Sequence, residues 1–134
     1  MNEIVKFLNE NSVHYLGTTD KDGKPKVRPF QFMLEKEGKL FFGTSNQKEV
    51  YREIKDNPYV ELCASSQSYE WIRLSGKVVF SDDLNIKADI IEHSPIVKSI
   101  YKTPDNPALE IFYLENAKAV IADFSGQPPR TINL

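Results

Sequence analysis

The chain has 134 residues, of which 40% are hydrophobic and 11% aromatic, so it can bury one core without disulfides or metals. We expect a single domain over residues 1–134, because a second core has no room. Its 17 Lys and Arg are balanced by 19 Asp and Glu, and the basic residues are scattered, which disfavours a nucleic-acid partner. A signal peptide and an apolar run of the roughly 20 residues that span a membrane are both lacking, so we expect a cytoplasmic protein without membrane contact.

The N-terminal third predicts a helix followed by the first strand. Residues 2–11 place apolar side chains at helical spacing, and residues 13–19 favour a strand that ends in the tight-turn sequence Asp20-Lys21-Asp22-Gly23. We expect His14 in this strand to be structural, and His93 to be a helix-end or surface residue, so the two histidines predict no metal site. The single cysteine, Cys63, excludes an internal disulfide, and we expect it to be packed rather than reactive.

The central stretch, residues 26–48, predicts a β-hairpin that leads directly into a helix. One strand is expected over residues 26–34, with Pro29 at an edge or bulge, and a turn at Glu37-Gly38 leads to a second strand over residues 39–43. A helix is expected from Lys48 to about Asp56, before Pro58. Asn46 and Glu49 have the spacing of a capping box, which predicts Asn46 as the N-cap.

The start of that helix is a candidate anion site. Two hydroxyls, an amide and an ammonium group surround its free N–H groups, a set suited to a phosphate: Thr44, Ser45, Asn46 and Lys48. The alternative is that these residues only cap the helix, as such residues commonly do.

The next two strands show alternation with a period of two. In residues 59–64, Val60, Leu62 and Ala64 form one buried face. In residues 70–80 the core side chains alternate with an outward set, Trp71, Arg73, Ser75 and Lys77. Trp71 and Arg73 together suit a subunit interface or a ligand, and the alternative is a solvent-facing cation–π pair.

The C-terminal third predicts helices over residues 83–93 and 95–100, then two strands over residues 109–114 and 118–124 that join at Glu115-Asn116. We expect the tail from Ser125 onward to cross the surface. Strands and helices do not alternate regularly, so the fold class is mainly β with short helices, an antiparallel barrel of about six or seven strands. Dinucleotide, P-loop and nucleophile-elbow motifs are absent.

The order of five segments resembles a known family. They are Val27-Arg28-Pro29-Phe30, Phe42-Gly43-Thr44-Ser45-Asn46, Lys48, Asn57-Pro58 and Trp71-Ile72-Arg73-Leu74-Ser75-Gly76. This order resembles the pyridoxamine 5'-phosphate oxidase-like FMN-binding split barrels over nearly the whole chain. More narrowly, it is similar to the small Nim-type, or nitroimidazole-resistance-like, members.

The resemblance implies an FMN cofactor and a set of residues that bind it. Arg28 and Lys48 match the basic positions that hold the FMN phosphate, and Thr44, Ser45 and Asn46 match the segment that adds further donors. The strand along the isoalloxazine ring corresponds to Pro29, Phe30 and Gln31. The family also implies a homodimer with each flavin at the subunit interface, where Trp71 and Arg73 line the ring from one or the other subunit. No side chain is singled out as catalytic, because the cofactor carries the hard chemistry.

Two departures from the family limit the function. The chain ends soon after Phe124, without the C-terminal Trp and Arg residues that bind pyridoxal phosphate in the vitamin B6 oxidases, so oxidation of pyridoxamine phosphate is not expected. Gln47 replaces a second basic residue, which predicts weaker FMN binding. Three functions stay open: an oxidoreductase that takes electrons from a reduced nicotinamide or another donor and acts on a small aromatic or nitro compound, a non-catalytic flavin-binding sensor, and a split barrel that binds haem or a deazaflavin.

Overall fold

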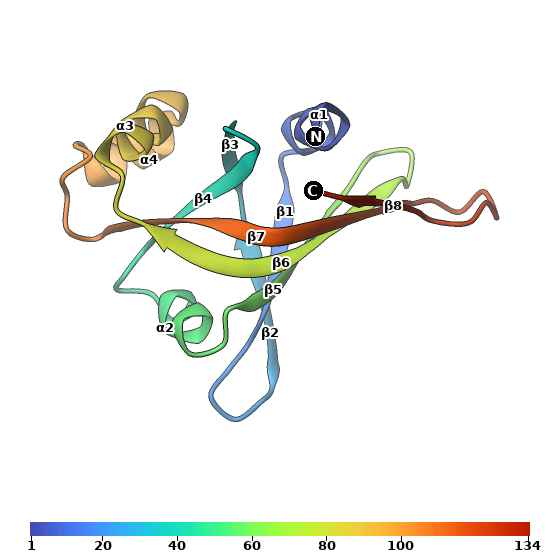
Figure 1. Cartoon of the computed structure of the whole chain (residues 1–134), viewed down its shortest axis with the longest axis horizontal. Helices are drawn as coiled ribbons and strands as arrows, with labels where there is room; N and C mark the ends of the chain where they lie inside the picture. The colour runs from blue at the N-terminus through green and yellow to red at the C-terminus, as the bar shows by residue number, and fades with distance from the viewer.

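The computed structural model describes all 134 residues as one eight-stranded antiparallel sheet with four helices (Figure 1). The strands are β1 (His14–Thr19), β2 (Pro25–Phe30), β3 (Phe32–Lys36), β4 (Lys39–Ser45), β5 (Tyr59–Ser65), β6 (Trp71–Ser81), β7 (Leu109–Ala122) and β8 (Arg130–Asn133). The helices are α1 (Asn2–Glu10), α2 (Glu49–Asp56), α3 (Leu84–His93) and α4 (Pro95–Tyr101). The mainly β barrel predicted from the sequence is confirmed. The tail contributes an additional strand, β8, where only a surface crossing was expected.

The two outermost strands of the sheet are consecutive in the chain and meet at one corner without pairing with each other. The strand order is β2-β1-β5-β6-β7-β4-β3, and only Gln31 separates β2 from β3. The prediction of one strand over residues 26–34 was therefore wrong. The chain changes neighbours at Gln31, since β2 pairs with β1 whereas β3 pairs with β4. At this corner the N–H of Phe32 donates to the Nδ1 atom of His14 at 3.2 Å. The position of Pro29 on an edge strand is confirmed.

The long strand β7 corrects a second prediction. The sequence predicted two strands joined at Glu115-Asn116, but the structure has one strand with a bulge there, because Asn116 adopts a positive φ of 53°. The bulge changes which alternate residues face the core. Leu114 is buried before it, and Ala117 and Ala119 are buried after it. A broken alternation in the sequence therefore marks a bulge here and not a turn.

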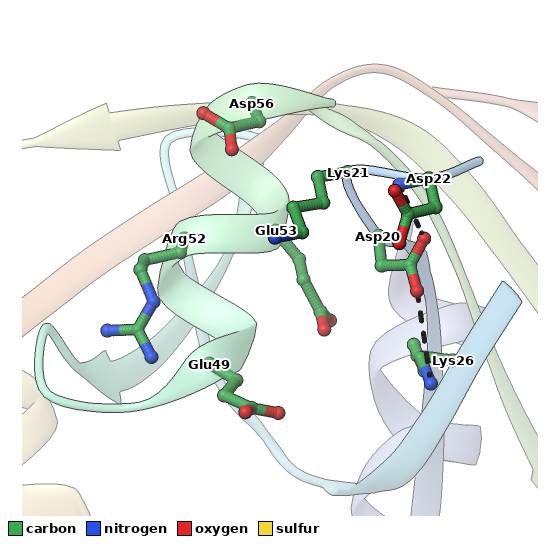
Figure 2. Close-up of a pocket in the computed structure, with 8 residues that line it drawn as sticks. All are labelled: Asp20, Lys21, Asp22, Lys26, Glu49, Arg52, Glu53 and Asp56. Atoms are coloured by element: carbon green, nitrogen blue, oxygen red, sulfur yellow. Dashed lines mark hydrogen bonds and ion pairs between the residues drawn. The ribbon is translucent and has the colours of Figure 1, made fainter. Parts of the chain in front are cut away.

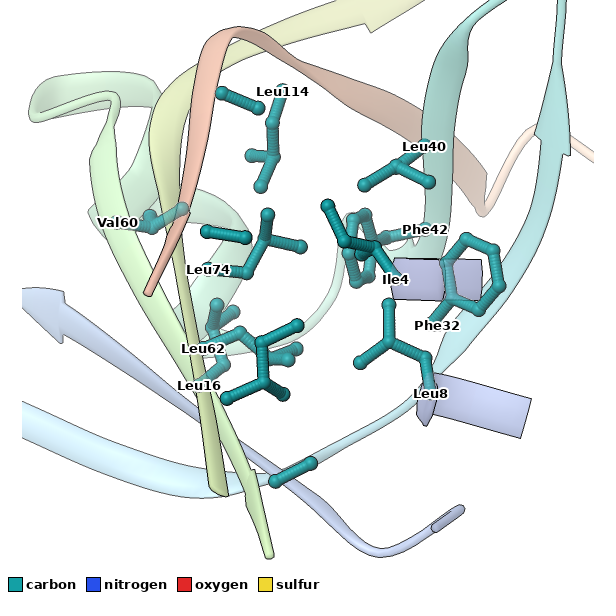
Figure 3. Close-up of a cluster of buried hydrophobic side chains, with 14 of the residues drawn as sticks. Ile4, Leu8, Leu16, Phe32, Leu40, Phe42, Val60, Leu62, Leu74 and Leu114 are labelled. Atoms are coloured by element: carbon teal, nitrogen blue, oxygen red, sulfur yellow. The ribbon is translucent and has the colours of Figure 1, made fainter. Parts of the chain in front are cut away.

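Two apolar cores lie on opposite faces of the central strands. The larger core fills the barrel interior, where Leu16, Leu62 and Leu74 face Leu40 and Phe42 (Figure 3). Helix α1 closes this barrel with the buried side chains listed here: Ile4, Phe7 and Leu8. The smaller core joins β3, β4 and the start of β7 to α3 and α4. Strands β4 and β7 contribute side chains to both cores, and β4 leads directly into the candidate anion site.

Candidate functional site

The candidate anion site lies where β4 ends and α2 begins. The predicted capping box is wrong: α2 starts at Glu49, its N-cap is Lys48, and no side chain caps it. The Asn46 side chain instead donates to the carbonyl of Pro107 at 2.7 Å, and its backbone N–H donates to the carbonyl of Ala108 at 3.0 Å. Asn46 therefore anchors this turn to the segment before β7, a long-range contact that the local spacing could not show.

The donors left at this turn fit a phosphate group. The backbone amides of Glu49 and Val50 have no acceptor in the chain, since α2 lacks a side-chain cap. The Lys48 side chain is exposed beside them, and the half-buried Ser45 hydroxyl accepts from the Gln47 N–H at 3.1 Å. The buried Thr44 hydroxyl has no hydrogen-bond partner at all. Free amides and a cation at a helix N-terminus are the groups that bind phosphate in other proteins.

Arg28, the other predicted phosphate ligand, is already paired within the chain. Its Nη2 atom lies 2.5 Å from Glu53 Oε1 on α2, and its Nη1 atom donates to the Thr18 hydroxyl at 2.7 Å. The Thr18 hydroxyl in turn donates to Glu53 Oε1 at 2.7 Å. A phosphate at Arg28 would therefore compete with the Glu53 carboxylate. The sequence did not predict Glu53 or Thr18 as members of this network. Strand alternation could have predicted that Thr18 faces inward, since it is buried opposite Lys26 in the register of β1 and β2.

A charged hollow of about 440 Å³ lies beside this network, between α2 and the β1–β2 turn (Figure 2). Its lining consists of five carboxylates and three cations: Asp20, Lys21, Asp22, Lys26, Glu49, Arg52, Glu53 and Asp56. Neither an anionic phosphate nor an apolar flavin ring suits a lining of this kind. The hollow therefore does not fit FMN. Only the turn at Lys48 fits a part of FMN, namely its phosphate group.

The strand predicted to lie along the flavin ring divides its side chains between two faces. Phe30 points into the barrel, with its ring centroid 6.0 Å from that of Phe112, whereas Pro29 and Gln31 are exposed. A flavin on the outside of β2 would thus meet Pro29 and the backbone but not the ring of Phe30. The sequence prediction did not distinguish these faces.

Trp71 and Arg73 point outward from β6, as the alternation predicted. Arg73 Nε lies 2.8 Å from Glu61 Oε1, and this ion pair raises the pKa of Arg73. In the strand register, Arg73 on β6 lies beside Cys63 on β5, Cys63 lies beside Tyr15 on β1, and Tyr15 lies beside Pro29 on β2. These residues form one row across the outer face of four strands. Cys63 is only partly buried on this face, and this burial raises the pKa of its thiol.

Trp71 lies far from the anion site of the same chain. It pairs with Ser65 at the end of β5, whereas α2 leads into the start of β5 at Tyr59 (Figure 1). The length of β5 separates these points by roughly 20 Å at the usual rise per residue. The structure therefore brings Arg28 together with α2, and it places Pro29 and Arg73 on one outer face with β1 and β5 between them. It does not bring Trp71 to Lys48 within one chain.

A curved antiparallel sheet whose first and last strands meet at a single residue, closed by one helix, defines the split β-barrel class. The family model of pyridoxamine 5'-phosphate oxidase matches residues 1–120, and the chain belongs to this family. A NimC/NimA family protein from Clostridium acetobutylicum is 33% identical, with a TM-score of 0.91 over 100% of this chain and 92% of that one. A search of curated proteins found no match.

More distant solved structures share the fold. A pyridoxamine 5'-phosphate oxidase-related, FMN binding protein from Nostoc punctiforme is 17% identical, with a TM-score of 0.74 over 97% of this chain and 87% of that one. A heme binding protein from Mycobacterium smegmatis is 14% identical, with a TM-score of 0.74 over 96% and 56% of the two chains. An F420 reductase is 22% identical, with a TM-score of 0.62 over 82% and 90%. None of the four helices of this chain is long and apolar enough to cross a membrane.

Proposed function

We propose that the protein binds FMN and acts as a flavin-dependent oxidoreductase on a small organic compound, such as a nitro or aromatic compound. One observation carries the proposal: the turn at Lys48 has two free backbone amides that can bind a phosphate, and it lies in a chain of the pyridoxamine 5'-phosphate oxidase family. FMN fits better than FAD, because the fold has one such turn and no dinucleotide fingerprint for an adenylate. The cytoplasmic location expected from the sequence belongs to this proposal.

In this proposal the chain binds and orients the cofactor. Lys48 and the free amides of α2 hold the phosphate, with Ser45 beside them, and Pro29 and the backbone at Gln31 lie along the ring. When bound, FMN supplies the transfer of electrons or a hydride. Arg28 reaches the phosphate only by leaving Glu53, so cofactor binding includes an exchange of ion-pair partners.

We also propose a homodimer with each flavin between two subunits. The outer face of β2, β1 and β5 exposes apolar side chains, including Val27 at 71% and Tyr59 at 66% exposure. Such an apolar sheet face marks a protein interface, and a two-fold partner is the commonest way to cover it. A shared site would let the partner's Trp71 and Arg73 line a flavin whose phosphate is held at Lys48, since the same chain's Trp71 lies far from Lys48.

Two alternatives are supported by the similar folds. The haem-binding and F420 reductase structures show that this fold occurs in proteins named for other ligands, and F420 is a deazaflavin. A visible spectrum separates them, because FMN absorbs in the blue and haem gives an intense Soret band. A flavin-binding protein without catalysis would bind FMN but reduce no nitro or aromatic compound when given reduced nicotinamide.

The experiment that tests the proposal combines cofactor identification with a charge-removal variant. Mass spectrometry of the cofactor released from the purified protein should find FMN. Lys48→Ala should weaken FMN binding by about 1.5–3 kcal/mol, the usual cost of losing a hydrogen bond to a charged group. Lys55→Ala, at the other end of the same helix, is the matched control and should leave binding unchanged. Recovery of FAD or haem, or equal FMN affinity in both variants, would refute the proposed site.

The dimer is tested by sedimentation over a concentration series. Dilution should release FMN together with dimer dissociation, and added FMN should restore the dimer by mass action. Trp71→Ala should weaken both equilibria. A monomer that binds FMN stoichiometrically at low concentration would contradict the shared site.

A further inference from the structure

His14 is the one titratable side chain that is almost completely buried, and the proposed flavin site does not use it. Only 1% of its surface is exposed. Its Nε2 atom lies 2.9 Å from the carbonyl oxygen of Leu8 in α1, and its Nδ1 atom lies 3.2 Å from the backbone nitrogen of Phe32 at the start of β3. One imidazole thus joins the closing helix to the corner where the chain passes from β2 to β3.

These two partners determine the proton arrangement of the ring. The Leu8 carbonyl can only accept, so Nε2 carries the hydrogen, and the Phe32 N–H can only donate, so Nδ1 must be unprotonated. A second proton would place an N–H group against the N–H of Phe32 at 3.2 Å. The contact between His14 and the corner therefore exists only in the neutral ring.

The surroundings of His14 offer no charge that would stabilise a second proton. Its strand partners are Phe30 on β2 and Ala64 on β5, and α1 presents apolar side chains to the barrel. The charged and titratable groups on the elements around it point elsewhere. Lys6 and Glu10 are paired with each other on the exposed side of α1, Arg28 is paired with Glu53, Glu35 is exposed, and Cys63 and Glu61 lie on the outer face of β5.

Burial lowers the pKa of His14, and the nearby backbone of Leu8 and Asn11 opposes this effect only in part. The unfolded chain, with an ordinary histidine pKa of about 6.5, therefore binds the proton more tightly than the folded chain. Stability from His14 is fully present above that value and is lost as the pH falls from it toward the lower pKa of the folded state.

We propose that His14 is a proton-sensitive latch that holds α1 and the Phe30–Phe32 corner to the barrel while neutral and releases both when protonated. The corner includes Gln31 and adjoins Pro29, which the proposed function places along the flavin ring. On that proposed function, mild acid also weakens flavin binding. The latch itself belongs to the empty protein, so it can be tested without any cofactor.

The first test measures the ring and the corner in the cofactor-free protein. Nitrogen NMR of His14 should show a neutral ring with hydrogen on Nε2 at pH 7 and a titration below the ordinary histidine range. Amide exchange should show that the protection factor of Phe32 and of the α1 amides falls by up to about tenfold per pH unit below pH 6.5. A ring that carries hydrogen on Nδ1, is charged at pH 7 or titrates normally would overturn the latch, and this measurement needs no variant.

The second test uses His14→Gln, which keeps a donor and an acceptor but does not titrate, with His93→Gln as the control at the exposed histidine. The fall in protection should disappear in His14→Gln and persist in His93→Gln. An unchanged pH profile in His14→Gln would overturn the proposal. Retention of FMN between pH 7.5 and 5.5 is measured separately: if the corner loosens while FMN stays bound, the latch stands and the placement of the flavin on this strand is wrong.

Discussion

Gly76 on β6 permits the bulge in β7, and adding one methyl group there should destabilise the fold. A Cβ atom at Gly76 would lie 2.9 Å from the Cβ of Leu114, 3.2 Å from the carbonyl oxygen of Glu115 and 3.4 Å from the Cα of Ala117. Two of these atoms are backbone in the centre of the sheet, so the clash cannot be relieved by rotating a side chain. Overpacking of this kind costs about 1–3 kcal/mol. For a domain of this size we expect Gly76→Ala to lower Tm by roughly 3–10 °C.

Gly43→Ala is the matched control, because it is also in a strand of the same sheet. A Cβ atom there would meet its nearest neighbours at 3.9 Å, an ordinary contact. Both variants should be compared by thermal and urea unfolding at one protein concentration, since association would shift the apparent stability. A Gly76→Ala variant within about 0.5 kcal/mol of the parent, or a Gly43→Ala variant that is equally destabilised, would refute the close approach at the bulge.

Three further predictions concern single contacts. Asp83→Ala should cost about 1 kcal/mol in urea unfolding, because the Asp83 carboxylate accepts from the backbone amides of Asn85 and Ile86, the second and third residues of α3. Arg28→Met should cost about 1.5–3 kcal/mol, since it leaves the mostly buried Glu53 carboxylate without its cation, and the double variant with Glu53→Leu should recover much of that loss in a double-mutant cycle. Phe124→Ala should change Trp71 fluorescence without measurable loss of stability, because the two rings lie 4.9 Å apart and Phe124 is 80% exposed.

Local patterns predicted those parts of the fold that depend on local forces. The alternation in β6 and the helix predicted over residues 83–93 are both present in the structure, since each depends on neighbouring residues. The bulge at Asn116 and the strand change at Gln31 could not be predicted, because each is set by the strand across the sheet.

The candidate site shows the same division. Alternation placed Trp71 and Arg73 on the outer face correctly, and it would also have separated the inward Phe30 from Pro29 had it been applied to β2. The pair between Arg28 and Glu53 joins residues 25 positions apart, and the Asn46 contact with Pro107 spans 61 positions. Contacts over such separations leave no local pattern in a single sequence.

The edge strand β2 bears on how copies of this protein can meet. Exposed strand edges promote open-ended polymerisation, because their free amides can hydrogen-bond to a strand of another chain. Along β2, Pro25 and Pro29 have no amide hydrogen to offer, and both stand at the rim of the same face that exposes Val27. Copies can therefore cover their apolar faces against each other while the rim gives an incoming strand too few donors to extend the sheet. Association through the sheet faces, and not through the strand edges, ends at a dimer. An exposed apolar sheet face therefore need not lead to fibrils.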